Sequence, residues 1–273
     1  MDFPRNLLHP EPGFDTVARG HRTQAVEMNG RIHLAFRKIT ARIMFGALFG
    51  HGRRRRCVAG AWLSGSGIEI GALHNPLAVP GAVRVTYVDR MDNEALLSQY
   101  PELVERPLVP VDIVDDGETL STIPDGSQDF VIANHLLEHC ENPIGALQAW
   151  LRVLKTGGIA YVTVPDKRFT FDFRRETTDW AHVLSDYERG PERSRRQHYM
   201  DWVRNIMSIG GGEADDACDY IEKNNHSIHF HTWTAKSFKA FFDACRKELA
   251  MPLSECDFIR NGIEVIVILK KTE

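Results

Sequence analysis

The stretch Gly67-Ile-Glu-Ile-Gly71 decides the fold, because a short apolar run that ends in glycine is typical of the first strand and turn of a nucleotide-binding α/β unit. A second apolar run, Val83-Arg-Val-Thr-Tyr-Val-Asp89, ends in a carboxylate twenty residues after Glu69. That span fits one strand, one helix and the next strand, and an acid at the second strand's tip is placed for ribose hydroxyls. The pattern predicts a site for an adenosine-type cofactor.

Further along the chain, short apolar runs alternate with helical periodicity, which predicts an α/β, doubly wound, Rossmann-like sheet with crossover helices. The clearest helix is predicted over 143–155, where Pro143 suits the first turn and Gly157-Gly158 follow the end. Thr234 is expected to cap a helix over 235–249. The predicted strands are 68–70, 83–88, 108–111, 130–133, 159–164, 229–233 and the β-branched run 262–269.

Two segments depart from this alternation. Residues 1–60 lack strand patterning, and 32–48 place apolar residues at near-helical spacing with basic residues between them, so we expect a helical N-terminal arm. The arm is either a lid or dimer arm packed on the domain, or a basic surface helix that meets a membrane or glycolipid. Residues 166–225 are charged and rich in aromatic side chains, which predicts a cap insertion within a main domain of residues 61–273.

The composition restricts the class of partner. With 273 residues, 43% of them apolar, the chain can form a full core, and a net charge of −4 gives no general positive field that would gather nucleic acid. The five cysteines form no CxxC pair, which argues against a disulfide framework or a thiolate zinc site. The apolar stretch 43–50 is far shorter than the roughly 20 residues that cross a bilayer. We expect a cytoplasmic protein with no transmembrane segment.

Polar side chains stand at the ends of several predicted strands. Ligands bind beyond the carboxyl ends of the strands in a doubly wound sheet. The residues expected there are Glu69 and Gly71, Asp89, Asp112, and Asn134 with His135. Because acids at three successive strand ends would repel one another without a compensating partner, the sequence predicts a ligand site at this edge.

These residues resemble the class I S-adenosylmethionine-dependent methyltransferases, of the methyltransferase type 11-like kind, over about residues 65–165. The resemblance is carried by Glu69-Ile-Gly71, Asp89, Asp112, the run Asp129-Phe-Val-Ile-Ala-Asn-His-Leu-Leu-Glu-His139 and Leu154-Lys-Thr-Gly-Gly158. It implies a seven-stranded sheet whose last strand is antiparallel, in a hairpin near 256–270.

The resemblance also implies S-adenosyl-L-methionine as cofactor. Gly71 would lie against its methionine moiety, Asp89 would bind the ribose, and the Asp112 region would lie near the adenine. The other residues expected at the cofactor are Glu69, Ala72, Arg90, Ile113, Asn134 and His135.

The first loop departs from the family, which usually has Gly-x-Gly-x-Gly where this chain has Gly71-Ala-Leu-His-Asn-Pro76. The loss of two glycines argues against a loop wrapped around a pyrophosphate, and so against a plain NAD enzyme. His74 and Asn75 can turn toward the cofactor carboxylate or the substrate, or Asn75-Pro76 can simply form a turn.

The histidines of the later segments are the candidates for chemistry. Methyl transfer to a hydroxyl needs alignment of donor and acceptor and removal of a proton. The expected catalytic groups are His139, His229, His231 and Asp166, with strand alternation placing His229 and His231 on one face. The alternative is structural: His139 bonds a backbone carbonyl, and the other two are hydrogen-bonded histidines of a partly buried strand.

The acceptor is expected to contact His74, His226, Arg168 and Trp233, since planar donors and an aromatic face bind hydroxyl-rich rings, although such residues are also common on a solvated cap surface. Asp166 or Glu138 can join two imidazoles around a divalent cation such as Mg²⁺, but the spacing alone does not establish a metal.

The longer strings 68–76, 133–143 and 229–234 are similar to a bacterial subgroup associated with sugar and polysaccharide O-methylation, which includes mycobacterial enzymes that methylate mannose oligosaccharides. This similarity implies a saccharide hydroxyl as acceptor, and it is compatible with dependence on a divalent metal and with a homodimer. The leading hypothesis is O-methylation of a saccharide or similar polar small molecule. The alternatives are an N- or C-methyltransferase of a small metabolite, and an inactive cofactor-binding scaffold subunit of a glycan-assembly complex.

Overall fold

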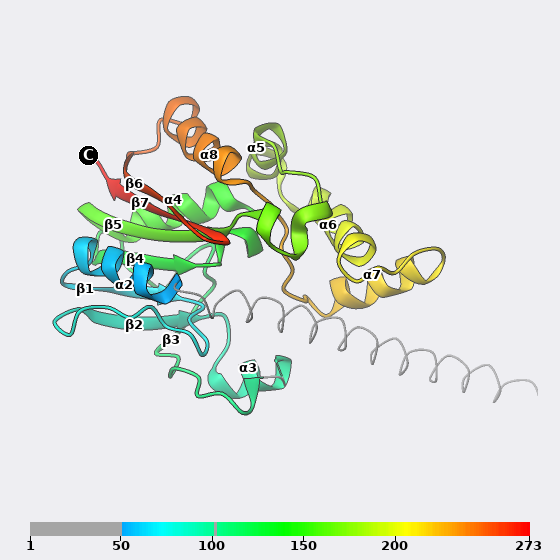
Figure 1. The fold of residues 1–273 in the computed structure, drawn as a ribbon, viewed down its shortest axis with the longest axis horizontal. Helices are drawn as coiled ribbons and strands as arrows, with labels where there is room; N and C mark the ends of the chain where they lie inside the picture. Colours follow the sequence, from blue (N-terminus) through cyan, green and yellow to red (C-terminus); the bar gives the residue numbers. More distant parts are fainter. Residues whose placement is uncertain (1–50, 101–102) are drawn as a thin grey trace, which may run out of the picture.

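The computed structural model describes residues 51–100 and 103–273, which form a seven-stranded sheet with helices on both faces (Figure 1). The strand order is β3-β2-β1-β4-β5-β7-β6. The first five strands in this order pair in parallel, and β7 runs antiparallel to both of its neighbours. The predicted Rossmann-like fold with an antiparallel last strand is confirmed. The helix expected over 32–48, and the arm as far as residue 50, lie outside the described residues.

The strands are β1 (Ser66–Ile70), β2 (Arg84–Asp89), β3 (Ile113–Val114), β4 (Gln128–Asn134), β5 (Leu154–Pro165), β6 (Leu253–Asn261) and β7 (Glu264–Lys271). The helices are α2 (His51–Trp62), α3 (Asn93–Gln99), α4 (Pro143–Val153), α5 (Trp180–Arg189), α6 (Glu192–Asn205), α7 (Glu213–Lys223) and α8 (Ala235–Glu248). Three 3₁₀ turns, η2 (Leu137–His139), η3 (Lys167–Phe169) and η4 (Phe171–Arg174), lie between them.

The two faces of the sheet have separate apolar cores, because successive side chains of a strand point to opposite faces. Phe130, Ile132 and Tyr161 pack with Val58 and Ala59 of α2 on one face. On the other face, alternate residues of the same strands pack against α4 and α8. Both faces of the central strands are therefore buried, which explains their continuous apolar runs.

The predicted start of α4 and the predicted cap of α8 are present, but α4 ends at Val153, and Gly157-Gly158, expected to follow the helix, lie within β5. Pro143 opens α4 after Asn142, whose side chain accepts from the Gly145 N–H. Thr234 caps α8, and its side chain and that of Ser237 each accept from the other's backbone N–H. These bonds satisfy N–H groups that a helix leaves unpaired at its start.

Three predicted elements are wrong. The connection from β1 to β2 contains no helix, because Pro76 and Pro80 disfavour helical backbone in it. The third strand is 113–114 and not 108–111, so Asp112 precedes the strand where it was expected to follow it. The segment 229–233 is not a strand, since its contact with the sheet is an isolated bridge between Asp166 and Trp233.

Residues 166–225, predicted as a cap insertion, contain η3, η4 and the helices α5, α6 and α7. Figure 1 shows α6 and α7 on the side toward which the parallel strands point. A separate apolar cluster, which includes Tyr199, Trp202 and Ile221, joins α6 and α7 to Ile228 and Phe230 of the following segment. This core fixes the segment 226–233 beneath the cap. No helix within the described ranges is long and apolar enough to span a membrane.

Candidate active site

The carboxyl ends of β1, β2 and β4 meet where the strand order reverses, which is the place where doubly wound sheets bind ligands. Ile70 is in register with Val88 on one side and with Ala133 on the other. The next residues, Gly71, Asp89 and Asn134, therefore lie side by side. We call the ends of β1, β2, β4 and β5 the carboxyl edge.

Gly71 begins the loop at this edge with a φ of +67°, which suits glycine, and its N–H bonds to the Val88 carbonyl at 2.9 Å. A Cβ at Gly71 would meet no atom closer than Leu136 Cδ1 at 3.8 Å. The backbone of the turn thus faces space that a ligand can enter. Asn75 N bonds to the Ala72 carbonyl, so the turn in this loop is centred on Leu73 and His74 and not on Asn75-Pro76.

Glu69 holds this loop in place. Its side chain is fully buried, and its two oxygens accept from the Leu77 N–H at 2.9 and 3.1 Å and from Asn134 Nδ2 at 3.2 Å. Burial raises the pKa of Glu69 to about 7, although these bonds favour the carboxylate. Because both oxygens are engaged within the protein, Glu69 positions the loop and does not itself face the edge.

Asp89 ends β2 and is 9% exposed. Its Oδ1 accepts from the Arg90 N–H at 2.8 Å, and burial raises the pKa of its carboxyl group. Arg90 extends to the Tyr100 hydroxyl at 3.0 Å. The structure thus brings Gly71, Asp89, Asn134 and the backbone after them together at the carboxyl edge, and their role in binding the cofactor stays a prediction.

Asp112 lies apart from this group. It is exposed, its Oδ2 accepts from the Tyr87 N–H at 2.8 Å, and it stands before Ile113, the first residue of β3. Asp115 follows β3 and its N–H bonds to the Asp89 carbonyl, but its side chain accepts from Ser121 and Thr122. The strand-end acid at β3 therefore fixes a loop.

His135 follows Asn134 with a φ of +51° and lies between two carboxylates. Its Nε2 is 2.7 Å from Glu264 of β7, and its Nδ1 is 3.3 Å from Glu138. Burial alone would lower the pKa of His135, but the two carboxylates raise it to about 9. Glu264 also binds Arg55 of α2 in a bidentate ion pair. A chain of alternating positive and negative groups therefore borders the site: Arg55 of α2, Glu264 of β7, His135, and Glu138 of η2.

A second group of polar side chains lies beside this edge, between η2 and the segment 228–231. The His139 Nδ1–H donates to the Ile228 carbonyl at 2.8 Å, and the His139 and His229 rings meet edge to face with centroids 4.7 Å apart. One ligand-type atom from each of Glu138, His139 and His229 lies within 4.8 Å of the others. Both oxygens of Glu138 are buried and lack a hydrogen bond.

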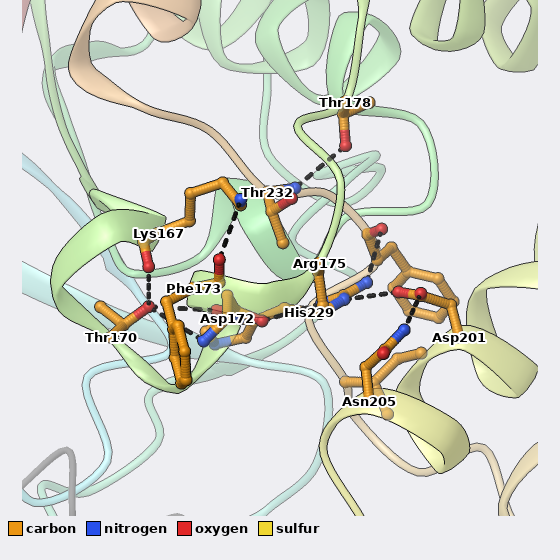
Figure 2. A network of polar contacts seen from close by, with 12 residues as sticks. Lys167, Thr170, Asp172, Phe173, Arg175, Thr178, Asp201, Asn205, His229 and Thr232 are labelled. Carbon is orange, nitrogen blue, oxygen red and sulfur yellow. Dashed lines mark hydrogen bonds and ion pairs between the residues drawn. The ribbon is translucent and has the colours of Figure 1, made fainter.

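His229 is oriented by Asp172 of η4, as Figure 2 shows. His229 Nδ1 lies 2.7 Å from Asp172 Oδ2, and Arg175 Nη1 donates to Asp172 Oδ1 at 2.9 Å. Arg175 Nε donates to Asp201 of α6 at 2.5 Å, and Asn205 supports Asp201 in turn. Burial opposes ionisation of Asp172, but His229 and Arg175 lower its pKa below the usual value. Asp172 is therefore a carboxylate that keeps the proton of His229 on Nδ1 and leaves the lone pair on Nε2.

The other expected catalytic groups are engaged elsewhere. Asp166 binds Arg168 through both oxygens and accepts from the Ala235 N–H at 3.0 Å, so it joins β5 to the start of α8. His231 is completely buried and belongs to a different histidine cluster, within the cap, so it does not share a site with His229. The expected shared face was wrong because the segment 229–233 is not a strand.

The residues expected at the acceptor do not gather in one place. Trp233 is 2% exposed and stacks on His231 with centroids 5.6 Å apart, Arg168 is paired with Asp166, and the His226 ring lies 5.8 Å from Tyr220 of α7. His74 lies on the first loop, where its Nδ1 is buried without a hydrogen bond and burial lowers its pKa. Of these four, His74 lies on the loop after β1 and Arg168 on η3 after β5.

Sequence reasoning missed Asp172, Arg175 and Glu264. Asp172 and Arg175 lie in a stretch of alternating aromatic and charged residues with no helical or strand period, so the pattern gave no direction to their side chains. Glu264 was included in the predicted last strand but not among the site residues. A charged residue just before the apolar run 265–269 is the signal that could have identified it.

Comparison with known proteins agrees with this geometry. A family model described as a methyltransferase domain matches residues 64–162. No curated protein matches the sequence. An S-adenosylmethionine-dependent methyltransferase from Thermotoga maritima, described as a possible histamine N-methyltransferase, is 14% identical, with 90% of this chain and 96% of that chain covered and a TM-score of 0.46.

Two archaeal structures are similar to the same degree. A methyltransferase of this class from Methanosarcina mazei is 16% identical, with 78% of this chain and 95% of that chain covered and a TM-score of 0.41. A putative one from Methanococcus maripaludis is 15% identical, with 90% and 94% covered and a TM-score of 0.41. Residues 64–162 thus match a methyltransferase domain, and this match supports the conclusion that the protein is an enzyme.

Proposed function

We propose that the protein transfers a methyl group from S-adenosylmethionine to a hydroxyl of a saccharide or similar polar small molecule. The observation that carries the proposal is the buried pair of Asp172 and His229 beside the carboxyl edge, at 2.7 Å. A carboxylate that orients a histidine is the arrangement that activates a hydroxyl nucleophile in many enzymes.

The carboxyl edge fits the cofactor. The open backbone at Gly71 can accept the methionine part, and the Asp89 carboxylate at the neighbouring strand end can accept from two ribose hydroxyls. Ala72, Arg90, Ile113 and the pair Asn134-His135 border this place in the chain and complete the proposed cofactor set, with Glu69 acting through the loop that it holds.

His229 is the proposed general base. When bound, S-adenosylmethionine supplies a methyl group on a sulfonium, whose departure needs no proton. An attacking hydroxyl must lose its proton, and His229 Nε2 is the nitrogen that can take it, because Nδ1–H is bound to Asp172. Arg175 keeps Asp172 ionised, so the carboxylate can stabilise the imidazolium that forms.

His139 is a weaker candidate for the base. Burial, together with the neighbouring His229, lowers the pKa of His139 to about 4, far from the value that suits proton transfer near neutral pH. Its bond to the Ile228 carbonyl leaves Nε2 as an acceptor. We assign it to positioning the acceptor hydroxyl next to His229.

An oxygen acceptor is favoured over a nitrogen acceptor by this arrangement, since an amine with a free lone pair needs less help from a base. The polar groups around the base, Glu138, His139 and Ser227, suit a hydroxyl-rich molecule. The similarity of the strings 68–76, 133–143 and 229–234 to sugar O-methyltransferases supports a saccharide. Two imidazoles and one carboxylate are a poor match for Mg²⁺, which prefers oxygen ligands, so the proposed step does not use it. A homodimer and a cytoplasmic location stay predictions from the sequence.

The test is an acceptor screen read by mass spectrometry, with monosaccharides, oligosaccharides and matched amino sugars. We expect methylation of hydroxyls, and a loss of about 10² to 10⁴ in rate for His229→Gln. Binding of S-adenosylhomocysteine should be unchanged in that variant, which shows that it has folded. Methylation of amines alone, at the same rate in His229→Gln, would reject an oxygen acceptor and this base.

A further inference from the structure

A second histidine cluster lies within the cap, outside the proposed acceptor site. It consists of His182 and Asp186 on α5, His198 on α6 and His231 on the segment before α8, and we call it the cap cluster. Figure 1 shows α5 and α6 on the same side of the molecule as the chain that leads into α8. His182 and Asp186 share a face of α5 because they are four residues apart. Two consecutive helices and a later segment thus bring four ligand-type side chains together.

The distances in the cap cluster match those around one metal ion. His182 Nε2 lies 2.9 Å from His198 Nε2 and 3.2 Å from Asp186 Oδ2, and His198 Nε2 lies 3.9 Å from the same oxygen. These three ligand atoms and one from His231 all lie within 4.8 Å of one another. Ligand atoms about 2.0–2.1 Å from a tetrahedral zinc ion lie roughly 3.3 Å apart.

The outer atoms of two of these ligands are already fixed by other groups. Asp186 Oδ1 accepts from Ser194 Oγ at 2.7 Å, which leaves Oδ2 directed to the cluster. The His231 Nε2–H donates to the Glu141 carbonyl at 3.3 Å, which leaves the lone pair on Nδ1. Metal-binding histidines and carboxylates are usually held by such outer hydrogen bonds.

Protons alone do not satisfy the cluster. His231 Nδ1 is buried without a hydrogen-bond partner in a residue that is 0% exposed, whereas Asp186 Oδ2 lies 3.2 Å from His182 Nε2 and 3.9 Å from His198 Nε2. A single proton can lie between the two Nε2 atoms of His182 and His198, and it does not reach His231. An unpaired buried polar atom costs about 1–3 kcal/mol, so His231 Nδ1 calls for a ligand.

We propose that the cap cluster binds one Zn²⁺ ion through His182 Nε2, Asp186 Oδ2, His198 Nε2 and His231 Nδ1. Three imidazoles and one carboxylate suit zinc, whereas Mg²⁺ and Ca²⁺ prefer oxygen ligands. Four protein ligands complete a tetrahedral shell and leave no position for substrate, which is the mark of a structural site.

The zinc ion would connect α5 and α6 to the segment that carries the proposed base. His231 is two residues from His229, and its N–H bonds to the Glu138 carbonyl at 3.2 Å. The metal therefore fixes the cap over the methyltransferase domain and holds the segment 228–231 against η2.

The test is zinc binding by the full chain after removal of metals with a chelator, followed by titration with Zn²⁺ alone. We expect the wild type to bind one equivalent of Zn²⁺ tightly. Glu138→Gln should bind zinc equally well, because Glu138 belongs to the other histidine group. His182→Ala and His198→Ala should each weaken zinc binding at least tenfold. The side chain of His182 is 30% exposed, so its loss should leave the fold intact, as circular dichroism of the metal-free proteins checks.

X-ray absorption of the zinc-loaded protein gives a second, independent result. It should report nitrogen and oxygen ligands at about 2.0–2.2 Å and no sulfur. Zinc should also raise the melting temperature of the wild type and of Glu138→Gln, but not of His182→Ala. The proposal is overturned if the wild type takes up no zinc, if Glu138→Gln abolishes uptake while His182→Ala and His198→Ala retain it, or if sulfur ligands appear.

Discussion

The charge on His135 should make the stability of the protein depend on pH in a particular window. Its ring lies between Glu138 and Glu264, and these carboxylates raise its pKa from 6.5 to about 9 against the effect of burial. Because the folded state binds this proton more tightly than the unfolded state, the stabilisation is fully present below pH 6.5 and is lost as the pH rises through about 9.

The magnitude follows from the difference between the two pKa values. One pKa unit corresponds to about 1.36 kcal/mol, so about 2.5 units give roughly 3 kcal/mol of stability at low pH. For a chain of this size, 1 kcal/mol shifts the melting temperature by about 2–4 °C. The change across the window is then at least about 6 °C.

The assay compares thermal unfolding of the wild type and His135→Gln between about pH 6 and pH 9.5, followed by circular dichroism. Glutamine keeps hydrogen-bonding capacity but cannot take a charge, and all other groups titrate in both proteins. The melting temperature of the wild type should exceed that of the variant most at pH 6, and the gap should narrow by at least about 6 °C at pH 9.5. A gap that stays constant with pH would show that His135 is not charged between the carboxylates.

Three further outcomes follow from specific contacts. A Cβ on Gly67 would lie 2.2 Å from the Phe130 carbonyl oxygen, so Gly67→Ala should lower the free energy of unfolding, measured in urea, by about 3 kcal/mol. The control Gly60→Ala, in open space on α2, should raise the free energy of unfolding by about 0.5–1 kcal/mol. Equal effects of the two substitutions would contradict the close approach of β1 and β4. Arg55→Met should cost about 3–5 kcal/mol in the same measurement, because it leaves the Glu264 carboxylate buried with one partner fewer, and a change below about 1 kcal/mol would argue against a buried pair. Asp172→Asn should reduce the methylation rate and leave the affinity for S-adenosylhomocysteine unchanged, because Asp172 orients His229, the proposed base, and lies outside the proposed cofactor set. Parallel losses of rate and of affinity would contradict this role.

The central sheet could be predicted because the sequence carries its signals locally. The runs at β1, β2, β4 and β7 are apolar and bounded by turn residues, and α4 has both its helical period and the predicted Pro143 at its start. The third strand was misplaced because it has only two residues, and so short a pairing leaves no pattern. The absence of a helix between β1 and β2 was marked by Pro76 and Pro80, whose effect outweighs the spacing from Glu69 to Asp89.

The site could be predicted only in part. Gly71, Asp89 and Asn134 follow from strand ends, since neighbouring parallel strands bring their ends together. The partners of the histidines do not follow, because they come from other elements: His229 meets Asp172 of η4, and His231 meets α5 and α6. Both histidines lie in an irregular segment whose side-chain directions are fixed by the packing of the cap and not by a strand period.

The most direct test of the account is the binding of S-adenosylhomocysteine, measured by calorimetry at the carboxyl edge of the sheet. We predict that the wild type binds one equivalent of S-adenosylhomocysteine. Asp89→Ala should weaken this binding by at least about tenfold, because it removes hydrogen bonds to a charged group. Asp125→Ala, at the opposite edge of the sheet with a 75% exposed side chain, should bind as the wild type does. Absence of binding heat in the wild type, or equal affinity in Asp89→Ala, would contradict the account.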